Sequence, residues 1–354
     1  MTTQSSTKKD DSMMLSSKPS TSSRSTSEMS FFLKNIQNTA HHFALWKRGD
    51  AFILAVSGGP DSMCLLDCLV FLGKKYKWRL HIAHVNYSLR GEESDADEQL
   101  VRERATFYGI PLTVLHPEVP SDTSNLEARL RTIRYEFFET LRIQLGFDAI
   151  AVAHTQDDQA ETVLLRLLRG AGLRGLGAMR FREGVVIRPF LFVTKSDILR
   201  YLKEKSLPFR VDQSNTDSRF TRNRIRHELL PLLETFNPNI RATLARSALS
   251  LADDADVFTT SLNQSVVFPK NDEDGAFVLD ASAFGVFPIA SQRAFLRAFI
   301  GEISGTHELP PPFSVIEEIR KFIASTKNKV AEKSFHGLKF TRRGAKVSVL
   351  LEKK

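Results

Sequence analysis

One hexapeptide in this chain, which begins at Ser57 and reads Ser-Gly-Gly-Pro-Asp-Ser, combines residue types that suit the binding of phosphate groups. Gly58 and Gly59 carry no Cβ, so the backbone can approach a ligand closely. Ser57 and Ser62 add hydroxyl donors, and Asp61 adds a carboxylate that can hold Mg²⁺ against phosphate oxygens. The hexapeptide therefore predicts a phosphate site with Asp61 as its metal ligand.

The segments on either side of the hexapeptide explain how it is positioned. The apolar run 51–56 suits a buried parallel strand, and 61–72 suits a helix. Pro60 fits the first helical turn, where its missing N–H costs nothing. The free amides of that turn and the positive helix end then face a ligand beyond the strand. The spacing matches neither a Walker loop nor a dinucleotide fingerprint, and an ordinary glycine turn without a ligand is the simpler alternative.

A second group of chemically active residues lies in the sequence Ala-His-Thr-Gln-Asp-Asp-Gln-Ala-Glu-Thr at 153–162. Asp158 and Glu161 are three residues apart at an expected helix start, so both project from one helix face. Carboxylates there can bind ammonium groups and help to deprotonate an attacking amine. The alternative is that they stabilise the helix dipole, which explains Asp157 equally well. His154 either contacts the ligand or is a buried core histidine.

Arginines gather in three places along a chain whose net charge is +8. The guanidinium group of arginine can bind two phosphate oxygens at once. The clusters therefore predict contacts with phosphate groups, either those of an RNA backbone or those of a nucleoside triphosphate in the predicted phosphate site. A solvated helix face is the alternative for any one of them. The clusters are Arg129, Arg131 and Arg134; Arg166, Arg169 and Arg174; and Arg219, Arg222, Arg224 and Arg226.

Strands and helices alternate through the first half of the chain. This pattern indicates βαβ units and an α/β fold with a doubly wound parallel sheet. Ligands bind such sheets beyond the carboxyl ends of the strands, where the hexapeptide, His84 and His154 all fall. We expect strands at 51–56, 80–85, 112–116, 149–153 and 185–187, and helices at 61–72, 92–108, 126–145 and 157–169.

Composition divides the chain into three regions. Residues 1–30 are rich in Ser and Thr, and we expect them to be disordered. Residues 31–235 form the larger domain of alternating strands and helices, which ends in a basic helix at 220–235. Residues 236–354 form a smaller, mainly helical domain. Its expected elements are helices at 239–262, 289–300 and 314–325, and a hairpin at 337–340 and 346–351.

The hydrophobic content and the cysteines of the chain indicate where the protein is located. The chain has 354 residues and 42% hydrophobic residues, with no apolar stretch long enough to cross a bilayer, so we expect a protein without a membrane segment. Its two cysteines, Cys64 and Cys68, are spaced four apart and are expected in the core. Few cysteines favour a reducing, cytoplasmic location.

Further motifs identify a family. The hexapeptide resembles the pyrophosphate loop (PP-loop) of the N-type ATP pyrophosphatases, and over 52–231 the chain closely resembles the tRNA(Ile)-lysidine synthases. It departs from the family at Tyr87 and Ser88, where the usual text is His-Gly, and at Thr155, where a second histidine is usual. The matching motifs are HVNYSLR at 84–90, SNLEARLRTIRY at 124–135, AHTQDDQAET at 153–162, LLRLLRGAGLRGLGAM at 164–179 and VDQSNTDSRFTRNRIRHELLP at 211–231.

The resemblance implies a two-step reaction that uses ATP and Mg²⁺. ATP adenylylates the C2 oxygen of the wobble cytidine in the isoleucine tRNA with a CAU anticodon, and pyrophosphate leaves. The ε-amine of L-lysine then attacks C2 and expels AMP, so that the product, lysidine, pairs with A and decoding changes from AUG to AUA. The family also implies that residues 31–235 are the PP-loop catalytic domain and that residues 236–354 bind tRNA, and it suggests a homodimer.

The same resemblance assigns roles to individual residues. Asp61, Asp158 and Glu161 would be catalytic, with Asp61 holding Mg²⁺. The nucleotide would be bound by Ser57, Gly58, Gly59, Pro60, Asp61, Ser62 and His84. The tRNA and lysine would be contacted by Asp158, Glu161, Arg129, Arg169, Arg222 and Arg224.

Three alternatives remain open from the sequence. A tRNA thiolase of the same superfamily would carry further cysteines for sulfur transfer or an iron–sulfur cluster. A synthetase or amidotransferase acting on small molecules would leave the arginine clusters without a purpose. A non-catalytic RNA-binding module with a degenerate ATP site is the third, and the intact hexapeptide argues against it.

Overall fold

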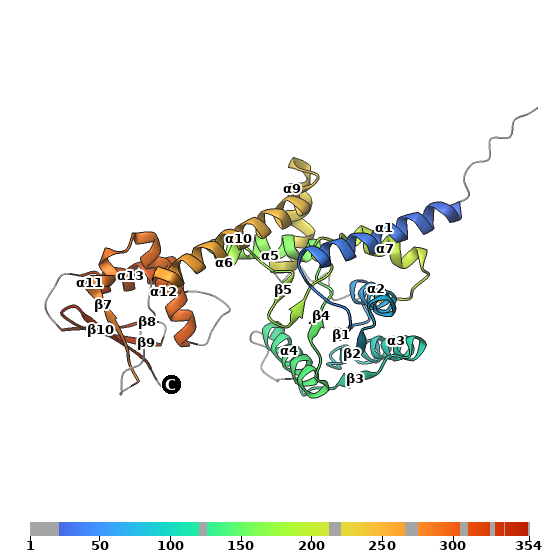
Figure 1. Ribbon diagram of the computed structural model, residues 1–354, viewed down its shortest axis with the longest axis horizontal. Helices are drawn as coiled ribbons and strands as arrows, with labels where there is room; N and C mark the ends of the chain where they lie inside the picture. The colour runs from blue at the N-terminus through green and yellow to red at the C-terminus, as the bar shows by residue number, and fades with distance from the viewer. Residues whose placement is uncertain are drawn as a thin grey trace, which may run out of the picture. The chain divides into compact units, whose positions relative to one another are not determined.

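The computed structural model describes residues 21–119, 126–211, 221–265, 275–304, 311–325, 330–335 and 337–352 (Figure 1). The chain divides into two compact units. The first runs to Asp157 and resumes from Phe181 to Asn215, and the second comprises Asp158–Arg180 and the chain from Thr216 onward.

The first unit is built on a six-stranded sheet with the order β3-β2-β1-β4-β6-β5. Every expected strand is present, and the five strands β1, β2, β3, β4 and β6 pair in parallel, which confirms the predicted fold class. The two-residue strand β5 pairs antiparallel with β6 at the edge and was not expected. The strands are β1 (Ala51–Ala55), β2 (Arg79–Val85), β3 (Leu112–Leu115), β4 (Ala149–Ala151), β5 (Arg182–Glu183) and β6 (Val186–Ile187).

Helices cover both faces of this sheet, as the alternating side chains of β1 show. Phe52 and Leu54 point into a core that they share with the helices α1, α2, α3 and α7. Ile53 points to the opposite face and packs against Phe138 and Leu141 of α4. The helices are α1 (Thr21–His42), α2 (Pro60–Tyr76), α3 (Glu92–Tyr108), α4 (Leu126–Leu145) and α7 (Lys195–Glu204).

Helix α1 differs from the expectation for residues 1–30. It begins at Thr21, so the last ten of those residues are helical, whereas residues 1–20 lie outside the described part of the chain. Leu33, Ile36 and Ala40 of the same helix are buried. Packing of this amphipathic portion supplies the stability that lets the polar amino-terminal turns continue the helix.

The second unit begins inside helix α5 (Gln156–Leu168), and its described residues include two separate apolar cores. One is formed by Ala160 and Leu164 of α5 with Ile225 and Leu230. The other fills the carboxyl-terminal region, where an antiparallel sheet with the order β7-β10-β9-β8 contains the predicted hairpin. The remaining elements are α6 (Leu173–Leu176), α10 (Ile240–Ser265), β7 (Phe277–Asp280), α11 (Ala281–Val286), α12 (Ile289–Ser304), α13 (Phe313–Ile323), β8 (Ala331–Phe335), β9 (Leu338–Arg343) and β10 (Lys346–Leu351).

The basic helix expected at 220–235 is interrupted. It consists of α8 (Thr221–Arg224), a π-helical turn η2 (Ile225–Leu229) and α9 (Leu230–Phe236). A π turn accommodates one extra residue, which changes the helix face that the following residues share. No helix among the described residues is both long enough and apolar enough to span a membrane.

Candidate functional site

The phosphate loop, residues 57–62, connects β1 to α2 with the geometry that its residue types predict. Gly58 has a φ of +90°, and Gly59 is the N-cap of α2, with Pro60 following in its first turn. Ser62 is buried, and its hydroxyl accepts from the Ser57 amide at 3.1 Å and donates to the Gly59 carbonyl at 3.0 Å. The two serine hydroxyls, 3.1 Å apart, therefore brace the loop at its base.

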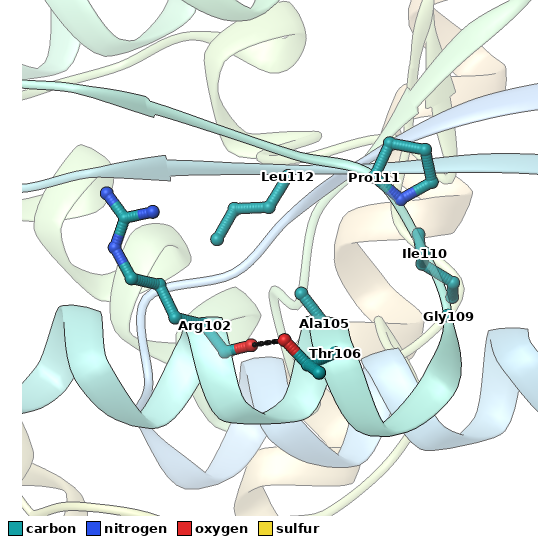
Figure 2. Close-up of a pocket in the computed structure, with 7 residues that line it drawn as sticks. All are labelled: Arg102, Ala105, Thr106, Gly109, Ile110, Pro111 and Leu112. Atoms are coloured by element: carbon teal, nitrogen blue, oxygen red, sulfur yellow. Dashed lines mark hydrogen bonds between the residues drawn. The ribbon is translucent and has the colours of Figure 1, made fainter.

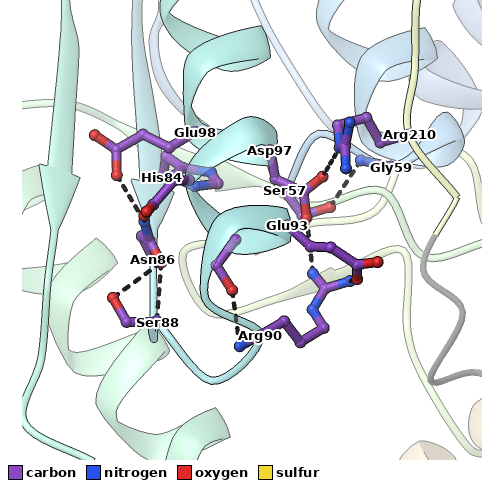
Figure 3. Close-up of polar contacts among 12 residues, drawn as sticks. Ser57, Gly59, His84, Asn86, Ser88, Arg90, Glu93, Asp97, Glu98 and Arg210 are labelled. Atoms are coloured by element: carbon purple, nitrogen blue, oxygen red, sulfur yellow. Dashed lines mark hydrogen bonds and ion pairs between the residues drawn. The ribbon is translucent and has the colours of Figure 1, made fainter.

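Two residues that sequence analysis did not select hold this loop against α3. Asp97 of α3 binds Arg90 and Arg210, each at 2.7 Å, and Figure 3 shows both guanidinium groups directed at its carboxylate. The backbone N–H of Arg210 donates to the Gly58 carbonyl at 3.0 Å. A Cβ on Gly58 would lie 3.3 Å from the Asp97 carbonyl oxygen, so this close approach requires glycine. Arg210 lies 113 residues from Asp97, too far for any sequence motif to reveal the contact.

The loop opens on a cavity of about 620 Å³ in the first unit. Its size suits a nucleotide, and polar groups from five segments converge on it. Ser57 and Asp61 line it from the loop, and Arg134 and Tyr135 line it from α4. Its further lining includes His84, Asn86, Arg90 and His154, which follow or end the strands as the sequence predicted.

His84 lies at the end of β2 with only 3% of its surface exposed. Its Nδ1 lies 2.8 Å from the Val56 carbonyl and must donate to it, which leaves Nε2 unprotonated. Nε2 is buried and has no hydrogen-bond partner among the described residues. Burial lowers the pKa of His84, so the ring is neutral at physiological pH.

Asn86 has a structural explanation. Its amide donates to Asp95 at 3.1 Å and to Glu98 at 2.9 Å, while its carbonyl oxygen accepts from the Ser88 amide at 2.8 Å (Figure 3). Burial alone would raise the pKa of Glu98, but hydrogen bonds from Asn86, Arg102 and His116 outweigh it and lower the pKa to about 2. This network attaches the loop after β2, in which Arg90 lies, to the first turns of α3.

Asp61 lies in the first turn of α2, and its nearest recorded ionic partner is a lysine that sequence analysis missed. The Nζ atom of Lys195, at the start of α7, is 3.7 Å from Asp61 Oδ2. Among the described residues, no group of three or more metal-binding side chains occurs. A single carboxylate beside a phosphate loop fits Mg²⁺, which usually combines one or two protein carboxylates with substrate phosphates and water.

His154 follows β4 and is held from behind by a buried arginine. Arg188 Nε lies 3.3 Å from His154 Nδ1, and its NH2 group binds Glu183 at 3.1 Å. Because a guanidinium always donates, Nδ1 of His154 must accept. The imidazole is therefore oriented by Arg188 while it lines the cavity.

In the second unit, the predicted carboxylate pair is gathered with two of the predicted arginines. Glu161 is 1% exposed, and its carboxylate accepts from Arg222 Nε at 2.9 Å and from Arg226 Nε at 2.5 Å. Arg222 also reaches Asp158 Oδ1 at 3.5 Å. Arg222 and Arg226 are four residues apart, so they lie on one face of the helical segment and both reach the same carboxylate.

The other arginines have different surroundings. Arg166 is committed to the turn after α5, because it donates to the carbonyls of Gly175 and Ala178 at 2.8 and 3.1 Å. Arg224 pairs with Glu228 at 3.3 Å on the surface, and Arg131 stacks on Tyr135. Arg129, Arg169 and Arg174 are exposed, whereas Arg219 lies outside the described residues.

A second hollow in the first unit, of about 510 Å³, lies between α3 and β3 (Figure 2). Arg102 is its only ionisable lining residue, and the hydroxyl of Thr106 is already bonded to the Arg102 carbonyl at 3.0 Å. The hollow therefore lacks the groups that catalysis requires.

Curated proteins with similar sequences share one name. The tRNA(Ile)-lysidine synthase of Geobacter sulfurreducens is 42% identical over 228 residues, which cover 63% of this chain and 48% of that protein. The enzyme of the same name from Chlorobaculum tepidum is 42% identical over 207 residues, or 57% of this chain and 61% of that one. The chain thus spans about half the length of the curated relatives it matches.

Solved structures share the fold. The U34-tRNA thiolase NcsA from Methanococcus maripaludis, with its [4Fe-4S] cluster, superposes with a TM-score of 0.53 at 17% sequence identity, covering 64% of this chain and 80% of that one. The PP-loop domain family matches residues 28–233, which contain the phosphate loop, the cavity and the carboxylate pair. From its sequence and from the loop geometry, this chain belongs to the PP-loop domain family.

Proposed function

We propose that this protein is an ATP-dependent tRNA-modifying ligase that joins L-lysine to C2 of the wobble cytidine in the CAU-anticodon isoleucine tRNA. The reaction would form lysidine and change decoding from AUG to AUA. The observation that carries the proposal is the phosphate loop at the amino end of α2, opening on a nucleotide-sized cavity. Similarity to tRNA(Ile)-lysidine synthases over 63% of the chain supports the choice of substrates.

In the first step, the C2 oxygen of cytidine attacks the α-phosphorus of ATP. The bond between that phosphorus and the bridging oxygen breaks, and pyrophosphate leaves. The backbone amides of the loop and the hydroxyl of Ser57 would bind the leaving group, because donors aimed at developing negative charge lower the barrier. Asp61 would hold Mg²⁺, which supplies further charge neutralisation when bound. His84 would help to seat the nucleotide.

In the second step, the ε-amine of lysine attacks C2 and AMP leaves. The amine must lose a proton before it can attack, and Asp158 and Glu161 are the carboxylates proposed to bind lysine and assist this loss. Within this pair, Glu161 binds Arg222 and Arg226 at 2.9 and 2.5 Å and its side chain is 1% exposed, whereas Asp158 meets the same arginines at 3.5 and 3.8 Å and its side chain is 14% exposed. Asp158 is therefore the better placed to meet an incoming ammonium group.

Arginine side chains would supply the contacts to tRNA. Arg129 and Arg169 are exposed, and Arg224 is 63% exposed at its side chain. Arg222 is 32% exposed and can meet a phosphate while it remains bonded to Glu161. The net charge of +8 favours association with a polyanion.

A tRNA thiolase is the competing proposal, since a thiolase shares the fold. An iron–sulfur cluster is held by cysteine thiolates. Both cysteines of this chain, Cys64 and Cys68, are buried in the core behind the loop, and burial raises the pKa of Cys64 well above its usual value. Neither thiol is placed for sulfur transfer, which favours the ligase.

The deciding experiment measures incorporation of labelled lysine into an unmodified CAU-bearing isoleucine tRNA transcript with Mg-ATP. The control transcript carries uridine in place of the wobble cytidine. We expect label and released pyrophosphate with the first transcript and no label with the control. Pyrophosphate release without label would reject the ligase in favour of another adenylylating enzyme, and absence of both signals would reject catalysis.

The lysine-binding role has a separate test. We expect Asp158→Asn to raise the KM for lysine while the KM for ATP changes little, and Glu161→Gln to raise the lysine requirement more than the ATP requirement. Equal changes in both constants would remove the assigned role. Glu228→Gln, which removes an exposed carboxylate that pairs with Arg224 in the same segment, serves as the matched control for lysine affinity.

A further inference from the structure

We infer that Lys195 is a phosphate-binding residue of the loop site, where its ammonium group neutralises the pyrophosphate portion of ATP. The inference rests on the proposed use of ATP and adds a residue that no motif indicated. Lys195 is the first residue of α7, and its Nζ lies 3.7 Å from Asp61 Oδ2. Asp61 itself lines the cavity.

The backbone of Lys195 is fixed on two sides. Its N–H donates to Asp157 Oδ2 at 3.1 Å, and Thr194 caps α7 by accepting from the Asp197 amide at 3.1 Å. The sequence favoured equally a site role for Asp157 and an interaction with the dipole of its own helix, and the structure shows its carboxylate bonded to the amino end of a different helix. Its carboxylate therefore contributes to placing Lys195.

Helix α7 is also anchored to the helix that carries the loop. The Tyr201 hydroxyl donates to Asp67 Oδ2 of α2 at 2.6 Å, and Ile198 and Leu202 are fully buried in the shared core. The first turns of α2 and α7, which carry Asp61 and Lys195, are consequently held in a fixed position relative to each other. This arrangement keeps the ammonium group beside the loop.

The position of Lys195 is unfavourable for α7 itself. A cation in the first turn opposes the positive end of the helix dipole, where acidic residues are preferred. An anion at the same place would relieve this repulsion, and phosphate is the anion that the adjoining loop is built to receive. Asp157, which accepts from the Lys195 N–H, and Asp197 in the same turn already offset part of this repulsion, and a bound phosphate would offset it further.

The contact between Lys195 and Asp61 is weak enough for Lys195 to exchange Asp61 for a phosphate group. At 3.7 Å it is longer than a tight charged hydrogen bond, and the Lys195 and Asp61 side chains are 39% and 25% exposed. Such partly exposed pairs are weak. With Asp61 holding Mg²⁺, the Lys195 ammonium group would be able to turn toward a phosphate oxygen.

Equilibrium binding of pyrophosphate tests this directly and does not depend on turnover. With Mg²⁺ present, we expect Lys195→Met to weaken pyrophosphate binding about 10- to 100-fold, as the loss of a charged hydrogen bond does. Lys195→Arg should recover most of the affinity. Lys203→Met removes an exposed lysine near the other end of α7 and should bind like the unchanged protein.

A second comparison separates Lys195 from the metal. In excess chelator, Lys195→Met should still bind pyrophosphate more weakly than the unchanged protein. Asp61→Asn should bind at least as well there, because a negative charge and a competitor for Lys195 have been removed. With Mg²⁺ present, Asp61→Asn should instead bind more weakly.

Equal affinity of Lys195→Met and the unchanged protein, with unaltered thermal unfolding, would overturn the inference. If Lys195→Met unfolds, Lys195→Gln replaces it, and failure of Lys195→Arg to exceed Lys195→Gln in affinity would be equally decisive. Loss of pyrophosphate affinity together with no lysine incorporation by the unchanged protein would retain Lys195 and reject only the proposed ligase reaction.

Discussion

Gly58 is the residue whose conformation most constrains the site. Its φ of +90° is a region that side chains rarely adopt, and the nearest neighbour of an added Cβ is backbone, at 3.3 Å. Gly59, by contrast, has a φ of −74°, and an added Cβ would meet only the Ser57 hydroxyl, at 3.5 Å. The two adjacent glycines therefore serve different purposes.

Replacing each glycine should separate these purposes. We expect Gly58→Ala to destabilise the protein by about 1–3 kcal/mol, because of backbone strain and displacement of Asp97. Mg-ATP binding should weaken with it. Gly59→Ala should leave the thermal transition nearly unchanged, and differential scanning calorimetry with ATP titration measures both. Similar losses in the two variants would contradict the structural distinction.

Glu98 should give the protein a pH-dependent stability. Its pKa is lowered from 4.5 to about 2 in the folded state, so the stabilisation is fully present above the unfolded-state value and is lost as the pH falls toward 2. The shift corresponds to about 3 kcal/mol. We expect Glu98→Gln to lose about this amount at neutral pH and to flatten the decline below pH 5.

Urea unfolding across pH 3–7 provides the measurement for Glu98, with Glu103→Gln as the matched control. Glu103 is exposed on the same helix and binds only Gln99 among the recorded contacts of the described residues. A pH profile for Glu98→Gln parallel to that of Glu103→Gln would contradict the assigned network.

At the scale of elements, the π turn η2 organises the second unit's charged cluster. It carries Arg226, which reaches Glu161, and it leads into Leu230, which packs in the apolar core with Ala160 and Leu164. Removal of one residue between Arg226 and Leu230 would rotate one relative to the other by about 100° about the helix axis, so both sets of contacts could not be kept. The π turn thus allows the same helical segment to contribute to the apolar core and to the ion pairs of Glu161.

Deletion of His227, within η2, should restore α-helical spacing and change the register between Arg226 and Leu230. We expect a loss of about 3–5 kcal/mol in unfolding free energy, because either Leu230 leaves its buried position or Glu161 loses one of its charged partners. Chemical denaturation measures the loss. Arg224→Ala, at an exposed pair, should cost under about 1 kcal/mol. A deletion no more costly than Arg224→Ala would show that η2 is dispensable.

At the scale of the whole molecule, the described residues form separate apolar cores. Leu54 belongs to the core behind the parallel sheet, and Phe340 belongs to the core of the carboxyl-terminal region. The two clusters share no residue. Such regions can unfold as separate cooperative units.

Calorimetry should therefore resolve more than one transition. Phe340 and Leu54 are both buried. We expect Phe340→Ala to reduce the unfolding free energy of the carboxyl-terminal core by about 3–5 kcal/mol and so to lower the temperature of one transition. Leu54→Ala should reduce the unfolding free energy of the other core by about 2–5 kcal/mol and lower the temperature of the other transition. ATP should raise only the transition sensitive to Leu54→Ala. Equal displacement of all transitions by either variant would indicate a single cooperative unit.

Local patterns were sufficient for much of the fold. The apolar runs and helical periods predicted all five parallel strands and the helices between them, because periodicity is a property of neighbouring residues. The elements that the sequence missed have non-local causes. Strand β5 exists only through pairing with β6, and the polar start of α1 continues a segment held by the sheet's core.

The sequence by itself determined the phosphate loop and the shared face of Asp158 and Glu161, since glycine geometry and helical spacing act within a few residues. Only the tertiary structure decided which groups stabilise them. Asp97 and Lys195 reach the loop from α3 and α7, and Arg222 and Arg226 reach Glu161 from more than sixty residues away. Contacts between distant segments depend on how packed elements bring side chains together, and that information is absent from any short motif.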